Sequence, residues 1–390
     1  MNALVLLKTS DGGFWSVAGA TALARRGHRV TFLLPRLQGP LPDQVRSAGL
    51  EVVRAEAPLP GQPAWRQPGA IRRLRRQVRS LDADVLVSHL YASALAGRGA
   101  TWRTDVPHVF MSPGPLYLEN ALIRAVERVA WRLDDQVIAS SDALDDAYRR
   151  LGVPDDRRSN IAYSIGAGWA AATTPEERSS ARAALGLDAD EFVAVCVAYF
   201  YAPKRLVHRG KGIKGHDVLL EAWRRHKDRG GRGTLAVVGD GFGPAGVAHR
   251  QDLLSRYGEL EGVRWVGHAD DVAPWYRAAD VSIAPSRSEN HGAAAEASLL
   301  AIPTIASRVG GLPELVVDGE TGWLVPPDDP AALLDALERA IAAGPEQRRA
   351  LGLRACERAT ARYDPAVTDE AFADTVEEVV RRGRHDRHHQ

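Results

Sequence analysis

Short apolar runs alternate with helix-like segments along the whole chain. In the first half these runs lie at residues 3–7, 30–34, 85–88, 109–111 and 136–139. A second series begins near Phe192 and continues at residues 235–238, 264–266, 281–284, 304–306 and 322–325. Apolar runs that alternate with helical patterns are typical of parallel α/β sheets. The pattern therefore predicts two α/β domains, each built on a parallel sheet.

The segment between the two series predicts the domain boundary. Residues 165–175 are small, turn-rich and weakly periodic, as expected of an interdomain linker. A helical pattern over residues 366–382 follows the second series, and we expect the tail from residue 382 to 390 to be disordered. A chain of 390 residues is long enough for two domains of ordinary size.

Composition excludes several classes of function. The formal net charge is only +1, so no global field attracts the chain to nucleic acid. The two cysteines are far apart, and Cys196 lies in an apolar run that predicts a buried free thiol. The first apolar run lacks a basic region and is too short for a signal peptide, and no apolar stretch is long enough to span a bilayer. We expect a soluble cytoplasmic protein.

One basic segment raises the question of lipid contact. Residues 72–79 contain five arginines on a helical pattern. Such a segment suits anionic lipid, but a solvated helix face is the commoner explanation. We expect no membrane association.

The chemistry concentrates between residues 285 and 307. A buried strand runs into a turn-rich loop and then a helix, with Glu289 and Glu296 on either side of Gly292. A helix start offers free N–H groups and partial positive charge, and glycine permits close approach of a ligand. Carboxylates accept hydrogen bonds from sugar and ribose hydroxyls. This combination suggests a nucleotide-sugar site; the alternative is a glycine loop whose carboxylates face solvent.

Further motifs surround that segment in a fixed order. They are Lys214 with Gly215, residues 235–241, residues 263–267, residues 310–317 and residues 319–325. Their order and spacing resemble the C-terminal domain of glycosyltransferase family 4, over about residues 190–365. The first half resembles the family more weakly, through Gly12, Gly13 and residues 24–30, 84–89 and 135–141.

The resemblance implies an α/β fold of the GT-B type, with two facing Rossmann-like domains and parallel sheets. Residues 1–168 together with 366–390 would form an acceptor-binding domain, to which the last helix returns. Residues 169–365 would form the domain that binds the nucleotide-sugar.

The resemblance also implies how the donor phosphates are held. Lys214 matches the lysine that neutralises them, and a lysine at a loop-to-helix junction reaches a phosphate as a point charge. The arginine that the family usually has just after the preceding strand is absent. The following loop supplies Arg209, which we favour as the second cation, and then Arg205; a solvated basic loop is the alternative. No metal-ligand constellation is visible, so we expect no metal or cofactor.

The two glutamates depart slightly from the family pattern. The family has seven residues between them, whereas Glu289 and Glu296 are separated by six. Glu296 resembles the glutamate that holds the ribose hydroxyls, and Glu289 the one near the transferred sugar. The predicted substrate-binding residues beside them are Asn290, His291, Gly292 and Ala293. This shortened form resembles a subgroup associated with bacterial natural-product pathways.

Two glycine turns are expected to border the nucleotide. Gly239 and Gly241 follow a buried strand, where open α/β sheets bind ligands, but they lack the dinucleotide fingerprint. An ordinary turn explains them nearly as well. The resemblance places the base against the backbone near Gly267 and His268.

The first half offers fewer candidates. Gly12 and Gly13 resemble the loop that approaches the donor phosphates, although a tight turn is the plain alternative. His89 ends a strand and either lines the cleft or is a satisfied core histidine. Family members often carry a histidine after the strand at residues 109–111, where this chain has Ser112, Pro113 and Gly114. We therefore predict no firm general base: His108, His89 or a backbone group takes its place, or the donor phosphate accepts the proton.

The sequence thus predicts a retaining, hexosyl-type glycosyltransferase with a nucleotide-sugar donor and a small-molecule or glycoside acceptor. Alternatives are a nucleotide-sugar epimerase or hydrolase on the same fold, and a non-catalytic nucleotide-sugar-binding protein. A dehydrogenase with two Rossmann-like domains is disfavoured, because the dinucleotide fingerprint is missing after the first strand.

Overall fold

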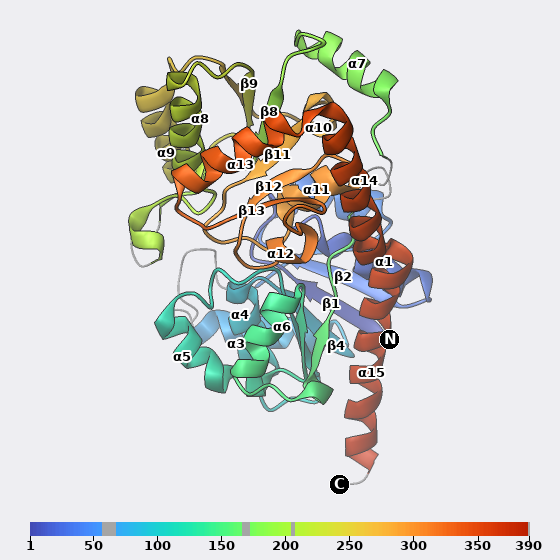
Figure 1. Cartoon of the computed structure of the whole chain (residues 1–390). Helices are drawn as coiled ribbons and strands as arrows, with labels where there is room; N and C mark the ends of the chain where they lie inside the picture. The colour runs from blue at the N-terminus through green and yellow to red at the C-terminus, as the bar shows by residue number, and fades with distance from the viewer. Residues whose placement is uncertain (57–67, 166–171, 204–206, 389–390) are drawn as a thin grey trace. The chain divides into compact units, whose positions relative to one another are not determined.

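The computed structural model describes residues 1–56, 68–165, 172–203 and 207–388. The chain divides into two compact units, Met1–Gly166 with Tyr363–Gln390, and Ala167–Arg362. Each is a Rossmann-like α/β unit on a parallel sheet (Figure 1), so the predicted fold class is confirmed. Most of the predicted linker lies outside the described residues.

Unit 1 is built on a seven-stranded parallel sheet with the order β3-β2-β1-β4-β5-β6-β7. The central strands are buried on both faces, and Ala3, Val5 and Val87 belong to one of its cores. Successive strands build outward on both sides of β1 and β4, so the order reverses between these two strands. The strands are β1 (Asn2–Leu6), β2 (Arg29–Leu34), β3 (Glu51–Arg54), β4 (Val85–His89), β5 (His108–Ser112), β6 (Gln136–Ala139) and β7 (Arg158–Asn160).

The last helix of the chain belongs to unit 1. Phe372, Val376 and Val380 of α15 join the core beneath α1. The expected disorder from residue 382 onward is wrong up to residue 388, because α15 continues to His388. The helices are α1 (Ser16–Arg25), α2 (Pro40–Ser47), α3 (Pro68–Ser80), α4 (Tyr91–Thr101), α5 (Ala121–Ala130), α6 (Asp142–Arg150) and α15 (Pro365–His388), with 3₁₀ turns η2 (Trp131–Leu133) and η3 (Asp155–Arg157).

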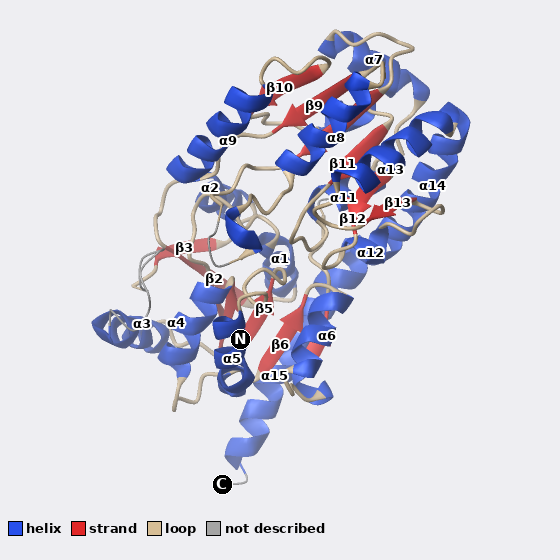
Figure 2. Cartoon of the chain, turned by 60° about the vertical axis from the view of Figure 1, so that its left-hand side comes forward, coloured by secondary structure: helices blue, strands red, loops and turns tan. Residues whose placement is uncertain are grey.

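Unit 2 is built on a six-stranded parallel sheet with the order β10-β9-β8-β11-β12-β13 (Figure 2). The order reverses between β8 and β11. In open α/β sheets, ligands bind outside the carboxyl ends of the strands at such a reversal. The strands are β8 (Val193–Val197), β9 (Thr234–Val238), β10 (Val263–Gly267), β11 (Val281–Ala284), β12 (Thr304–Ser307) and β13 (Gly322–Val325).

Helix α7 (Pro175–Leu185) of unit 2 begins at a well-defined cap. Thr174 and Glu177 form a capping box at the start of α7, which fixes where the chain leaves the linker. Among the described helices of both units, none is long and apolar enough to cross a membrane. The helices of unit 2 are α7 (Pro175–Leu185), α8 (His216–Asp228), α9 (Gly243–Tyr257), α10 (Ala273–Ala278), α11 (Gly292–Leu299), α12 (Leu312–Leu315), α13 (Pro330–Ala342) and α14 (Gly344–Tyr363), with a 3₁₀ turn η5 (His208–Gly210).

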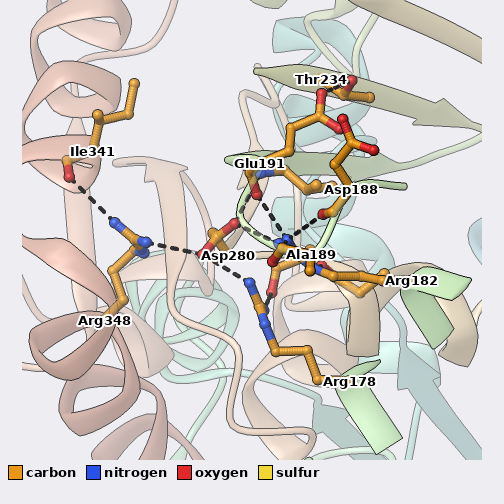
Figure 3. Close-up of polar contacts among 12 residues, drawn as sticks. Arg178, Arg182, Asp188, Ala189, Glu191, Thr234, Asp280, Ile341 and Arg348 are labelled. Atoms are coloured by element: carbon orange, nitrogen blue, oxygen red, sulfur yellow. Dashed lines mark hydrogen bonds and ion pairs between the residues drawn. The ribbon is translucent and has the colours of Figure 1, made fainter. Parts of the chain in front are cut away.

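A buried ionic cluster ties the amino-terminal edge of the second sheet together (Figure 3). Asp280, which directly precedes β11, accepts hydrogen bonds from Arg178 at 2.9 Å, Arg182 at 2.8 Å and Arg348 at 2.9 Å. It also accepts one at 2.8 Å from the N–H of Val193, the first residue of β8. One carboxylate therefore fixes α7, α14 and two strand ends at the edge opposite the expected ligand site.

Candidate functional site

The loops that carry the predicted donor residues meet at the carboxyl edge of the sheet in unit 2. Gly215 precedes α8 with φ +68°, and a Cβ on it would lie 1.9 Å from the carbonyl oxygen of Pro285. Only glycine permits this approach. The loop that bears Lys214 therefore packs directly on the loop that follows β11.

Lys214 and Glu289 form an ion pair in this corner. Their side chains are 17% and 12% exposed, so both are largely withdrawn from solvent. Burial disfavours the charged ammonium, but the Glu289 carboxylate and Tyr201 outweigh it, and the pKa of Lys214 is raised. The lysine is thus a fixed cation at the carboxyl edge, already neutralised by one carboxylate.

Further groups fix the Glu289 carboxylate. Its Oε2 accepts from the Ser286 hydroxyl at 3.2 Å, and its Oε1 from the N–H of Asn290 at 3.2 Å. Gly292, the first residue of α11, has φ +42°, and a Cβ on it would lie 3.0 Å from Oε1. The carboxylate therefore lies against the positive end of the α11 dipole. Gly292 and Ala293 open that helix, where N–H groups have no acceptor within the helix.

Glu296 belongs to the same electrostatic environment. Its Oε2 accepts a hydrogen bond from the Tyr276 hydroxyl at 3.0 Å. Burial raises the pKa of Glu296, while Tyr276 and the charge of Lys214 act in the opposite direction and the charge of Glu289 adds to the rise. The structure thus brings Lys214, Glu289 and Glu296 together, as the sequence predicted.

Two supporting residues were missed by the sequence analysis. Arg287 is 4% exposed and donates to both carboxylate oxygens of Asp217 at 2.7 Å, to Asp328 at 2.6 Å and to the carbonyl of Gly212 at 2.5 Å. It thereby fastens the Glu289 loop to the start of α8. Tyr276, on α10, orients Glu296. Their roles depend on tertiary contacts, and no local signal marks them.

His291 has a different environment from the one predicted. Its side chain is 5% exposed, and its Nε2 lies 3.0 Å from Oε2 of Glu314. Arg362 pairs with the same carboxylate at 2.6 Å. These contacts anchor the loop before α11 to α12, so the buried imidazole is explained as a structural group. Its role in binding substrate stays a prediction.

The two glycines of the turn that follows β9 have packing explanations. Gly239 has φ +140°, and a Cβ on it would lie 2.1 Å from the carbonyl oxygen of Ala198. A Cβ on Gly241 would lie 2.2 Å from the N of Val247. Gly267 has φ +78°, and the next residue, His268, is exposed and lies 3.1 Å from Asp270. Both turns lie at the predicted edge of the sheet, and their contact with a base stays a prediction.

The second cation also stays a prediction. Arg205 lies outside the described residues, and of Arg209 only the backbone is described, within η5. Lys211, from the same loop, lies 3.3 Å from Asp328, which also accepts from Arg287. In place of the family arginine after β8 stand Tyr199, Phe200 and Tyr201, and the ammonium of Lys214 lies 6.0 Å from the ring centroid of Tyr201.

The predicted residues of unit 1 lie on its own sheet edge. Gly13 has φ +94° and its carbonyl accepts from Ser16, which opens α1, while a Cβ on Gly12 would meet nothing within 4 Å. His89 is 1% exposed, and burial lowers its pKa to about 3. It lines a small pocket with Trp15, Tyr163, Asp369 and Phe372.

His108 is enclosed and cannot meet a substrate. It is 0% exposed, with Nε2 2.8 Å from the Ser88 hydroxyl and Nδ1 2.7 Å from Asp134.

Cys196 is buried and free as predicted, and burial raises the pKa of its thiol to about 12. Within the described residues, no group of three or more His, Cys, Asp or Glu side chains is arranged to hold a metal ion.

Comparisons with known proteins agree with this geometry. The family described as "Glycosyl transferases group 1" matches residues 203–343, and the family described as "Glycosyl transferase 4-like domain" matches residues 18–163. The chain is similar to the D-inositol 3-phosphate glycosyltransferase of Saccharomonospora viridis, with 30% identity over 89% of this chain and 77% of that protein. It is 29% identical to D-inositol 3-phosphate glycosyltransferase 2 of Catenulispora acidiphila, over 94% of this chain and 90% of that protein.

Solved structures show the same fold. Anabaena HepE in complex with UDP-glucose superposes with a TM-score of 0.78 at 21% identity, over 97% of this chain and 100% of that chain. Sucrose-phosphate synthase from Thermosynechococcus elongatus superposes with a TM-score of 0.78 at 24% identity, over 98% of each chain.

Proposed function

Since the chain belongs to glycosyltransferase family 4, with the GT-B fold, we propose that it is a retaining enzyme that moves a sugar from a nucleoside diphosphate to a small hydroxyl-bearing acceptor. The observation that carries this proposal is the pairing of Lys214 with Glu289 at the start of α11. Here a cation and a carboxylate lie together at the start of a helix, where backbone N–H groups have no acceptor within the helix. A donor needs these three groups for its diphosphate and its sugar.

The donor is proposed to be a UDP-sugar, because Anabaena HepE, which shares the fold, binds UDP and UDP-glucose. Lys214 would hold the diphosphate, Glu296 the ribose hydroxyls and Glu289 the sugar. The relatives are named for inositol 3-phosphate, which makes this polyol phosphate the first acceptor to test. A place in bacterial secondary metabolism stays a prediction from the sequence alone.

The proposed reaction needs little from the protein beyond electrostatics and positioning. The bond between the anomeric carbon and the β-phosphate oxygen breaks, and a bond forms between the same carbon and the acceptor oxygen. The proton of the acceptor passes to the departing phosphate. Lys214 and the N–H groups at the start of α11 offset the charge that develops on the leaving group. We propose that no metal ion is required, so activity should survive removal of divalent cations with a chelator.

The direct experiment has two stages. A thermal-shift panel of UDP-, GDP-, ADP- and dTDP-sugars identifies the donor, because a ligand that binds the native state raises its stability by mass action. NMR of the donor with D-inositol 3-phosphate then follows the anomeric signals. The proposal predicts a glycoside that keeps the anomeric configuration of the donor.

The rival functions predict other outcomes. Turnover of the donor at full rate without an acceptor would indicate a hydrolase or an epimerase. Tight donor binding without turnover against any acceptor would indicate a binding protein.

A further inference from the structure

Helix α5 of unit 1 carries its apolar residues on the outside. Leu122, Val126, Val129 and Leu133 recur at intervals of four, three and four residues, which places them on one side of the helix and its 3₁₀ extension. They are 74%, 49%, 67% and 43% exposed, respectively. We call these four residues the apolar stripe. An amphipathic helix normally buries such a stripe. In α5 the orientation is reversed, because the apolar residues face solvent and the charged Glu127 is buried.

A buried ion pair explains this reversed orientation of α5 and holds the helix in it. Glu127 is the buried residue of α5, 0% exposed, and it accepts hydrogen bonds from Arg98 of α4 at 2.8 and 2.6 Å. Tyr148 of α6 donates to it at 3.3 Å. Rotation of α5 to bury the apolar stripe would withdraw this carboxylate and leave Arg98 with Asp134 alone, and separating a buried pair is strongly unfavourable. The stripe is therefore held toward solvent.

Positive charge accompanies the apolar stripe. Arg124, Arg128 and Arg132 are exposed and recur every four residues along α5 and its extension; on the helical wheel Arg132 is the nearest to the apolar stripe and Arg124 lies nearly opposite it. Arg124 donates to the carbonyl of Leu118 at 2.9 Å, and Arg132 to that of Arg128 at 2.6 Å. A carbonyl acceptor leaves the net charge in place, so the exposed side of α5 outside the apolar stripe is basic.

The neighbouring helix continues the same chemistry. Trp102, one turn beyond Arg98 at the end of α4, is 52% exposed, and the guanidinium of Arg103 lies 4.7 Å from its ring centroid. On the other side of α4, Arg75 of α3 donates to the carbonyls of Ala100 and Trp102. Both views show α3, α4 and α5 side by side (Figures 1 and 2).

An exposed apolar stripe on a helix whose other exposed side carries arginines, with an exposed indole on the neighbouring helix, suits a helix that lies in the headgroup layer of an anionic bilayer. A second copy of the chain fits less well, because a two-fold contact would bring the same arginines face to face. We infer that α5 docks unit 1 on an anionic phospholipid surface, with the helix lying along the membrane and not crossing it. The inference goes beyond sugar transfer and departs from the expectation of no membrane association.

The test is sedimentation of the full chain with lipid vesicles. Vesicles of phosphatidylcholine mixed with phosphatidylglycerol should retain the protein, and vesicles of phosphatidylcholine alone should not. The double variant L122D/V129D should weaken this retention by tenfold or more, since burying one Leu or Val is worth roughly a factor of ten. The matched control is V367D on α15, because Val367 is 59% exposed outside the stripe. It should bind as the wild type does.

A second variant separates charge from apolar contact. R128E/R132E should weaken binding to anionic vesicles, and added salt should weaken the binding of the wild type in the same direction. Equal retention on both kinds of vesicle, or retention unaffected by L122D/V129D, would overturn the inference. So would a wild-type oligomer that L122D/V129D converts to a monomer, because the apolar stripe would then be a protein interface. Unfolding temperatures close to the wild type show that the exposed substitutions leave the fold intact.

Discussion

Lys214 and Glu289 are 75 positions apart in the sequence, and their charged groups are in direct contact at the start of α11. Glu289 therefore already pairs with the cation that a donor diphosphate would need. If Lys214 holds the donor diphosphate, as we propose, binding of the donor exchanges one anionic partner of the lysine for another. This relationship gives the site a testable property that a solvated lysine would lack.

Replacing Glu289 should separate binding from transfer. Glu289→Gln leaves the geometry and removes the competing charge, so Lys214 becomes available to the diphosphate. We expect calorimetry to show UDP binding about tenfold tighter, because a like charge near the ligand costs on the order of 1 kcal/mol or more. Transfer should fall about a hundredfold, as for loss of one preorganised electrostatic group.

Glu259→Gln, at an exposed position of the same unit, is the control and should change neither quantity. Weaker UDP binding by Glu289→Gln would show that the carboxylate assists the diphosphate and does not compete with it.

Gly292 tests the close approach at the start of α11. Gly292→Ala places a Cβ 3.0 Å from Oε1 of Glu289 at a backbone φ of +42°. The backbone strain should lower the free energy of unfolding by about 1–2 kcal/mol. The displacement of the Glu289 carboxylate should cause a large loss of transfer. Denaturant titration and initial rates measure the two effects.

Gly186→Ala is matched to this variant, because Gly186 has φ +64° and nothing within 4 Å of its Cβ position. Gly186→Ala should lower the free energy of unfolding to a similar extent and leave the rate of transfer normal. Equal activity of the two variants would remove Gly292 from the site.

Glu296 should make stability depend on pH. Burial raises its pKa in the folded chain, so the native state binds the proton more tightly than the unfolded chain does. Stability should therefore fall as pH rises from about 4.3, the usual glutamate pKa, through the raised value, and then level off. Glu296→Gln should lack this fall when unfolding is followed across that range.

The same variant tests the ribose assignment. Glu296→Gln should weaken binding of the nucleoside diphosphate by about 1–3 kcal/mol. If only the complete nucleotide-sugar binds less well, Glu296 contacts the sugar instead.

Asp280 should matter for stability and not for chemistry. Asp280→Asn leaves Arg178, Arg182 and Arg348 without their shared carboxylate, and losing one partner of a buried ion pair costs about 3–5 kcal/mol. Denaturant unfolding should show this loss, while transfer in the folded variant stays near normal. The exposed Asp190 provides the control, and Asp190→Asn should change stability by less than about 0.5 kcal/mol.

The sequence predicted the sheets well because their buried strands are continuous apolar runs. It missed β3 and β7, whose residues are mostly polar and only partly buried. The helix-start chemistry and the resemblance to glycosyltransferase family 4 predicted Lys214, Glu289 and Glu296 for one site, and these three residues do lie together. Arg287 was not predicted, because its partners Asp217 and Asp328 are remote in sequence.

Helix α5 shows a second limit of prediction from sequence, which concerns the direction that a helix face takes. Its apolar spacing is that of an ordinary helix facing a core. Glu127 reverses this orientation through Arg98, which lies on another helix. Periodicity finds the apolar side of a helix, but the tertiary partner of one buried charge decides which way that side faces.

The most direct test of the account is calorimetric titration of wild type and Lys214→Gln with UDP and with uridine. If Lys214 holds the donor diphosphate, the substitution should weaken UDP binding by roughly tenfold to a hundredfold, the value of a hydrogen bond to a charged group. Uridine binding should be unchanged, because the nucleoside lacks the phosphates. Equal affinity of the two proteins for UDP, or an equal loss for UDP and uridine, would contradict the assignment of this corner as the diphosphate site.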